Sequence, residues 1–444
     1  MSPAPKILQN NVPHPKVHKQ APLNCSCTLH MSLLSSSPKL RHSELSEPEQ
    51  KDRKRRHSEL SELEQKDRKR RRSEQMCRVD VTYMVENGLF SLFQKMQRGD
   101  PVPRTEPNAD VRHLIIPAVF VGYSGQSASE QRSCLSWVVS AFPNATTIKF
   151  EKPVSALEPL REHRCLVSID APGDYEVSAD ALPSQLTTLV MRSPRSKPVV
   201  SFPPKLQDLT AHGVKASVFE RCVGFAHLPT TWVSGSGWST HVSVELFEKL
   251  ICPEQKMEKF KACVEIGEGD NKEFTLPPSI SEFGIAMYVS GERWGATASM
   301  HVLVPEATKL QNLEVVSSPL YGGIRISVEG DHEIDRVLLR DCILETNTIS
   351  ARELVLEKQV GTCGGVGECP LEIAPCTAKL VVSLEKGPMP IMDHRIDHLS
   401  MLNIPNGHSL TLDMFPKHQF GKVVIGEQVP FRIAEHIAIQ GANN

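Results

Sequence analysis

The sequence has no run of about 18 apolar residues, which is the length that a helix needs to cross a bilayer. We therefore expect no transmembrane helix and no membrane partner. The beginning of the chain, Met1-Ser-Pro-Ala-Pro-Lys6, lacks the charged and then apolar layout of a secretory signal. These two absences predict a location in the nucleus or the cytoplasm.

Aromatic residues are scarce, at 5% of the 444 residues, so we expect an interior built mainly from Leu, Val, Ile and Ala. Paired Cys-x2-Cys spacings are absent, and the 12 cysteines are scattered. Scattered cysteines in a reducing compartment predict buried thiols, and neither a disulfide framework nor a zinc site. The glycine-rich segment 361–367 lacks the Lys-Ser/Thr of a phosphate loop. We predict no cofactor.

Basic charge is concentrated near the amino terminus. Residues 1–72 carry 16 Lys or Arg against 8 Asp or Glu, a balance of +8, which leaves −10 on the rest of a chain whose net charge is −2. Within this arm, residues 41–55 are repeated at 56–70 with a single change, Pro48 to Leu63. Apolar residues are too few there to pack a core, so we predict a disordered tail over 1–75.

Each copy of the charged repeat ends in a basic cluster of the kind that importin-type receptors bind, which predicts a nuclear localisation signal. Its residues are Arg53, Lys54, Arg55, Arg56, Arg68, Lys69, Arg70, Arg71 and Arg72. A solvated linker and nucleic-acid binding are the alternatives. The second is disfavoured, because no aromatic residue lies between the clusters to stack on bases. Ser58 and Ser73 follow arginines and are predicted phosphorylation sites, a hypothesis that mass spectrometry showing neither serine modified in cells would remove.

A phrase recurs in the rest of the chain: an apolar residue, a proline, and then leucines three residues apart. It is clearest in Leu182–Leu189 and Phe202–Leu209, and Leu276–Phe283 repeats it with other apolar residues. Recurrence every twenty to thirty residues or so is typical of a solenoid, in which each unit buries its apolar face against its neighbours. We expect the proline to begin a strand, with Leu186, Leu189 and Met191 inward, and Leu206, Leu209 and Ala211 inward in the next unit.

These residues resemble the LPxxLxxLxV variety of the leucine-rich repeat family. The resemblance implies a solenoid of parallel strands with a short irregular or helical convex side. We assign an N-terminal cap of helix and strand to 76–139, the irregular repeats to 140–430 and a C-terminal tail to 431–444. The asparagine that the family places after the strand is mostly absent. The alternative is a β-rich sandwich, which would show antiparallel hairpins.

The family resemblance implies a non-enzymatic scaffold that binds another protein through solvent-facing strand residues. Those residues are Thr188, Val190, Arg192, Asp208, Thr210, His212, Glu282, Asn312 and Glu314. Their acidic lean suits a basic partner, although its identity is open. Two alternatives remain, a nucleic-acid-associated protein that binds through the arm, and an enzyme with a site around Asp393 to His398. In that segment the two histidines would share one face of a helix at the i,i+4 spacing that zinc enzymes use, although a third ligand is not evident.

Overall fold

The protein is described from a computed structural model, and the chain divides into two units, Met1–Gln65 and Lys66–Asn444. The described residues all lie in the second unit: 77–78, 107–116, 128–192, 197–235, 237–290, 298–317, 322–330, 332–346, 348–362, 371–387, 389–391, 394–404 and 420–426. The predictions for the basic arm, for Ser58 and Ser73, and for the 431–444 tail therefore lie outside the described residues.

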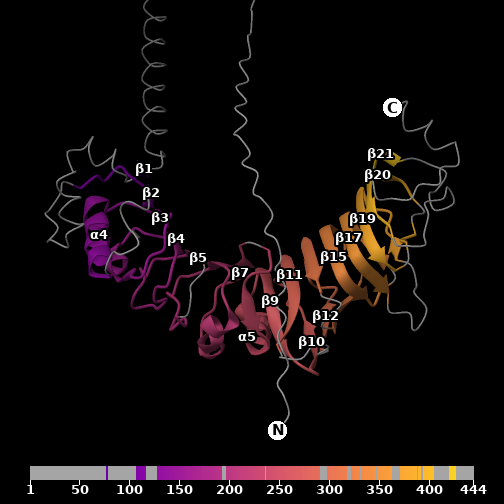
Figure 1. Cartoon of the computed structure of the whole chain (residues 1–444), viewed down its shortest axis with the longest axis horizontal. Helices are drawn as coiled ribbons and strands as arrows, with labels where there is room; N and C mark the ends of the chain where they lie inside the picture. Colours follow the sequence, from indigo (N-terminus) through magenta and orange to yellow (C-terminus); the bar gives the residue numbers. More distant parts are fainter. Residues whose placement is uncertain are drawn as a thin grey trace, which may run out of the picture. The chain divides into compact units, whose positions relative to one another are not determined.

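Most strands of the second unit belong to one 19-stranded sheet, in which every pairing among the described residues is parallel. The strands stack in the order of the sequence, as Figure 1 shows from indigo to yellow. We call this stack the long ladder. It comprises β1 (Cys77–Arg78), β2 (His113–Ile116), β3 (Thr147–Phe150), β4 (Ser168–Pro172), β5 (Thr188–Arg192), β6 (Asp208–His212), β7 (Thr231–Ser234), β9 (Lys259–Gly267), β11 (Glu282–Ser290), β13 (Asn312–Val316), β15 (Ile334–Leu344), β17 (Ala351–Thr362), β19 (Lys379–Lys386), β20 (Ile396–Asn403) and β21 (Phe420–Ile425).

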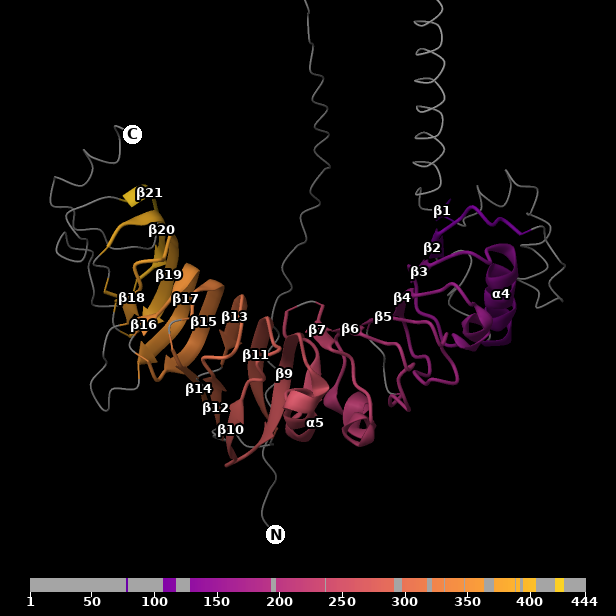
Figure 2. The same ribbon diagram turned by 180° about the vertical axis from the view of Figure 1, so that it is seen from behind.

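A second, shorter row of parallel strands is formed by segments that lie, in the sequence, between successive strands of the long ladder. We call this row the short ladder, and Figure 2 shows it from behind. It consists of β10 (Asn271–Thr275), β12 (Ala298–Val304) and β14 (Gly322–Val328), and β14 also pairs with the end of β15. The remaining strands are β8 (His241–Ser243), which pairs with the second half of β9, and the two-stranded sheet of β16 (Thr348–Ile349) and β18 (Glu372–Ile373).

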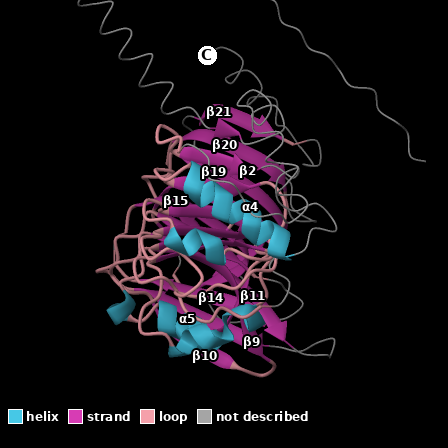
Figure 3. Cartoon of the chain, turned by 90° about the vertical axis from the view of Figure 1, so that its left-hand side faces the viewer, coloured by secondary structure: helices cyan, strands magenta, loops and turns pink. Residues whose placement is uncertain are grey.

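Helical segments cover the inward side of the long ladder before the short ladder begins, and Figure 3 shows them in cyan against the strands. They are α4 (Ala128–Ala141), η1 (Glu158–Glu162), η2 (Ala216–Gly224), α5 (Val244–Leu250) and η3 (Pro253–Gln255). Phe247 of α5 packs on Phe260 and Phe274, with ring centroids 5.0 and 4.8 Å apart. The core therefore lies between the long ladder and the layer formed by these helices and the short ladder.

Alternation of buried and half-buried residues confirms the predicted inward positions. Leu186, Leu189 and Met191 are at most 1% exposed, and Leu209 and Ala211 are fully buried. Leu206 is 7% exposed, which is still within the core. Each fully buried leucine stabilises the fold by about 1.5–3 kcal/mol relative to an exposed one. Repetition of this burial in every coil holds the ladder together.

The recurring proline lies in a different place from the one predicted. It opens a turn, and the strand begins several residues later. The carbonyl of Pro183 accepts a hydrogen bond from the N–H of Leu186 at 3.1 Å, and β5 begins only at Thr188. Pro203, Pro277 and Pro305 accept in the same way. A proline at the start of such a turn loses no ladder hydrogen bond, because its missing N–H lies outside the sheet.

Two fold expectations need correction. The sandwich alternative required antiparallel hairpins, whereas the described strands pair only in parallel. As far as η3, the segments that connect the strands of the long ladder are irregular or helical, as predicted. From β10 to β14, the connecting segments contain strands instead. Their sequences explain the change, because Ala298–Val304 and Gly322–Val328 alternate β-branched or apolar residues with polar ones. Among the described residues, no helix has both the length and the apolar character to span a membrane.

Candidate functional site

The side of the long ladder that points away from the core carries the residues predicted to bind a partner. We call it the outward face. The predicted residues all lie on it and are half-buried, because each alternates along its strand with a buried neighbour. They come from four strands: β5 (Thr188, Val190, Arg192), β6 (Asp208, Thr210, His212), β11 (Glu282) and β13 (Asn312, Glu314).

Residues of β5 and β6 form one polar group with β4. Thr188 donates a hydrogen bond to Asp208 at 3.3 Å, between residues that face each other in register. Arg192 donates two hydrogen bonds to the carboxylate of Asp170, at 2.8 and 2.7 Å. Bidentate geometry of this kind fixes the guanidinium in one orientation. Arg192 is thus already committed to an intramolecular partner.

His212 lies beside this pair and beneath the backbone of Gly235. A Cβ atom on Gly235 would approach the imidazole ring to 2.0 Å, so a larger residue there would force the ring of His212 to move. Burial lowers the pKa of His212, the positive charge of Arg192 lowers it further, and Asp170 partly offsets both effects. His212 is therefore held in its neutral form more strongly than a free histidine.

Residues of β11 and β13 pair with lysines of β9. Glu282 accepts a hydrogen bond from Lys259 at 2.7 Å, and this bond together with the charge of Glu282 raises the pKa of Lys259. Lys261 reaches across β11 to Glu314 of β13 at 2.5 Å. The path is open because Gly284 lies under it, where an added Cβ would be 2.9 Å from Lys261 Cγ. Glu282 and Glu314 are therefore each paired with a lysine of the same surface.

These two groups are not one compact site, because β7 and β9 lie between β6 and β11. What lies between them was not predicted from the sequence. β7 and β8 both pair with β9, and Trp238, which lies between them in the chain, turns back over the outward face. The ammonium group of Lys261 lies 5.0 Å from the centre of the Trp238 ring, within the range of a cation–π interaction.

Tyr288 of β11 extends the aromatic surface and is 43% exposed. Its ring lies 5.3 Å from that of His241, and His241 in turn contacts Glu265 at 2.9 Å. We call Trp238, His241, Lys261, Glu265, Tyr288 and Glu314 the aromatic patch. The patch combines two aromatic side chains with charges that are paired within the same surface.

Only part of the aromatic patch has a sequence signal. Lys259–Gly267 alternates polar and apolar residues, which is enough to predict a strand and to place Lys261 and Glu265 on one face. Trp238 has no such signal, because Ser234-Gly-Ser-Gly-Trp238 matches no known motif and its loop interrupts the period. The position of Trp238 follows from the register of β7 and β8 on β9.

The enzyme alternative at Asp393 to His398 rested on helical spacing, whereas the described residues of this segment, 394–398, are not helical. Asp397 and His398 lie in β20, which is paired with β19 and β21. Asp393 lies outside the described residues. In the part of the chain that the structure describes, no group of three or more His, Cys, Asp or Glu side chains has the arrangement of a metal site.

Comparison of the chain with protein-family models, with curated proteins and with solved structures found no match.

Proposed function

We propose that this protein is an interaction scaffold whose protein partner docks on the outward face of the long ladder, centred on the aromatic patch. The observation that carries the proposal is the placement of Trp238 and Tyr288 among charges already paired within the surface. The centres of protein interfaces are enriched in Trp and Tyr and depleted of charged residues. A partner covering the patch would bury aromatic surface without stranding an isolated charge.

We further assign the first coils of the ladder to the leucine-rich repeat type. Ser168, Thr188 and Asp208 are in register on β4, β5 and β6, so successive coils are 20 residues long. This length lies at the lower end of the range of about 20–29 residues for such repeats. The inward leucines of the recurring phrase support the same assignment. On the outward face we propose binding and no catalysis.

The binding proposal predicts that removing both aromatic anchors weakens the complex strongly. Partners of the full chain would be recovered from cells by affinity purification, and the affinity of each purified partner measured. Replacing Trp238 and Tyr288 by alanine is expected to lower the affinity for the partner by about 30-fold or more, because interface hot spots contribute roughly 2 kcal/mol or more. Circular dichroism would check that the variant is folded.

A matched control is available on the surface of the helical layer, on the side of the molecule opposite the outward face. Val200 and Val223 are 42% and 38% exposed, so replacing both by alanine removes exposed apolar area away from the outward face. This control should leave the affinity unchanged. Equal affinity of the Trp238/Tyr288 double variant and the wild type would contradict the proposal.

For the basic arm we propose nuclear targeting through an importin-type receptor, with nucleic-acid binding as the second candidate. The supporting observation is the pair of basic clusters, Lys51–Arg56 and Lys66–Arg72, in the tandem repeat. Deleting residues 41–72 is expected to move a fluorescent fusion from the nucleus to the cytoplasm. An unchanged distribution would refute targeting. Nucleic-acid binding that falls steeply with salt and is lost on the same deletion would favour the second candidate.

A further inference from the structure

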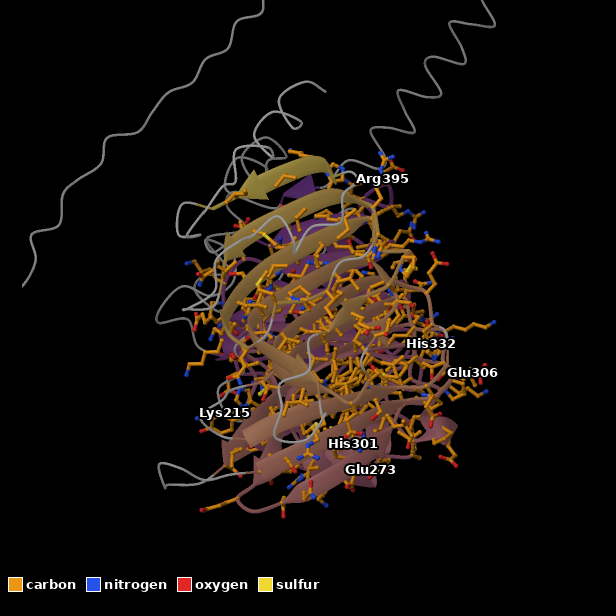
Figure 4. The ribbon with its side chains drawn as sticks, turned by 90° about the vertical axis from the view of Figure 1, so that its right-hand side faces the viewer. Lys215, Glu273, His301, Glu306, His332 and Arg395 are labelled. Carbon is orange, nitrogen blue, oxygen red and sulfur yellow. The ribbon has the colours of Figure 1, made fainter. Side chains whose placement is uncertain are left out.

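The outward side of the short ladder carries a second cluster of polar side chains, on strands other than those of the aromatic patch. Glu273 of β10, His301 of β12 and Arg325 of β14 occupy the same register position on three adjacent strands. Ser327 follows Arg325 by two residues on the same face of β14. Figure 4 shows the labelled side chains of Glu273 and His301 next to each other.

Distances within this cluster place a hydroxyl group against a base, and the base against an acid. Ser327 Oγ lies 2.8 Å from His301 Nε2, and His301 Nδ1 lies 3.7 Å from Glu273 Oε2. Ser327 also donates a hydrogen bond to Glu345 Oε2 at 2.7 Å. The side chain of His301 is only 24% exposed, so the strands restrict its orientation.

We propose that Ser327 is a nucleophile that His301 activates for acyl transfer from small esters. A serine hydroxyl is weakly nucleophilic unless a base accepts its proton. The Ser327–His301 distance is within reach of that transfer once the hydroxyl turns from Glu345, to which it donates in the structure, toward Nε2. Glu273 is the positioning residue that favours a proton on the far nitrogen of the ring. The acid–histidine–serine arrangement is identified by geometry and does not depend on the order of the three residues in the chain.

The reaction would proceed in two balanced steps. Ser327 Oγ attacks the ester carbonyl carbon while His301 Nε2 accepts the hydroxyl proton, and the C–O bond to the alcohol breaks as the imidazolium returns that proton to the leaving oxygen. Water then attacks the acyl-serine with His301 again accepting a proton, which releases the carboxylic acid and restores the hydroxyl of Ser327. Arg325 carries a positive charge at the edge of the cluster, with Nη1 3.9 Å from Glu345 Oε1.

A hollow lies next to the cluster and is bordered by His301 and Glu345, the two residues that contact Ser327. Its volume is about 280 Å³, and its lining also includes Asn271, Lys272, Glu273, Ser299, Met300 and Arg325. The lining is mostly polar, and its two carboxylates are balanced by the charges of Lys272 and Arg325. A short, uncharged acyl ester is therefore the substrate class that suits it.

Glu345 holds the serine hydroxyl in the resting state and competes with His301 for its proton. His301 Nε2 also lies 3.1 Å from Glu345 Oε2, so the carboxylate interacts with both groups. Replacing Glu345 by glutamine removes the negative charge, so residue 345 becomes a weaker acceptor for the hydroxyl proton of Ser327. The proposal predicts that Glu345→Gln raises the reactivity of Ser327, whereas His301→Gln lowers it. A purely structural hydrogen-bond network would not produce opposite effects.

The test uses the full chain and a fluorophosphonate probe, which modifies activated serines covalently. Mass spectrometry should locate the label on Ser327, and Ser327→Ala should abolish it. His301→Gln should slow labelling by about 100-fold or more, the size of a general-base contribution. Ser290→Ala is the matched control, because Ser290 lies on β11, outside the lining of the hollow, and its hydroxyl donates to the carbonyl of Ile266. It should label at the wild-type rate.

Absence of labelling on the wild-type chain would overturn the proposal, as would labelling that persists in Ser327→Ala. Equal rates for wild type, His301→Gln and Glu345→Gln would also overturn it. Thermal denaturation of each variant separates loss of the nucleophile from loss of the fold. These measurements are independent of the docking proposal, because no residue of the cluster belongs to the aromatic patch.

Discussion

Replacing Phe260 by alanine is expected to destabilise the protein by about 3–5 kcal/mol, the usual cost of deleting a buried phenylalanine ring. Phe260 is 1% exposed and connects two layers of the core. Its ring lies 5.0 Å from that of Phe247 in α5 and 5.8 Å from that of Phe283 on the neighbouring strand. Alanine would leave a cavity between the sheet and its covering helix, and close packing on both sides would limit how far the cavity collapses.

Urea denaturation followed by circular dichroism would measure this loss. Phe260→Leu is the graded comparison, since it retains much of the volume and should cost clearly less. Val223→Ala, at a residue 38% exposed, provides the surface control and should change the free energy of unfolding by no more than about 0.5 kcal/mol. A loss below about 1 kcal/mol for Phe260→Ala would show that α5 does not pack on β9 as described.

Replacing Gly173 by alanine is expected to cost roughly 3 kcal/mol or more, through strain and a clash acting together. Gly173 has φ of +121°, a region that residues with a side chain rarely adopt. A Cβ atom there would lie 2.1 Å from the carbonyl oxygen of Val154. That oxygen belongs to the backbone, and Val154 is also held by its N–H bond to Pro172 at 2.8 Å, so neither partner can move freely.

Gly237 separates the two contributions to that cost. Its φ is +54°, but a Cβ atom there would meet nothing within 4 Å. Gly237→Ala should therefore show only the conformational cost, about 1 kcal/mol. Thermal melting of both variants would test the comparison. Equal losses would mean that the contact between Gly173 and Val154 is looser than the structure indicates.

The aromatic patch and the serine–histidine cluster differ in the size and polarity of the surface that they offer. The aromatic patch offers large side chains with their neighbouring charges paired, which suits a macromolecule. The cluster on the short ladder offers a small polar hollow and a hydroxyl against a base, which suits a small molecule. Both surfaces arise in the coils from β7 to β15, which include coils longer than 20 residues: 28 from Thr231 to Lys259 and 30 from Glu282 to Asn312.

Leu189 and Leu209 illustrate what could be predicted about the fold. Both occupy the same place in the recurring phrase, and both are fully buried, because a period of two along a strand and a repeat between strands leave only one face to the core. The same logic placed Thr188 and Asp208 outward. The short ladder was not predicted, because its strands lie between the phrases, where no repeat directs attention to them.

Trp238 and Ser327 illustrate what could not be predicted about the sites. Trp238 reaches Lys261 only because β7 and β8 both pair with β9, which brings the segment between them beside that strand. Ser327 meets His301 only because β14 pairs with β12 in a particular register. Neither contact follows from spacing, since the residues between the strands could form turns of several lengths.

By itself the sequence determined the composition of the core, the alternation along each strand of the long ladder, and the separation of a basic arm from an acidic body. These are local properties, set by hydrophobic period and by charge. Tertiary structure alone decided which outward side chains become neighbours, because that depends on the length of each coil and on the register of its strands. Small changes in a turn shift register, and register decides whether a lysine meets a tryptophan or a serine meets a histidine.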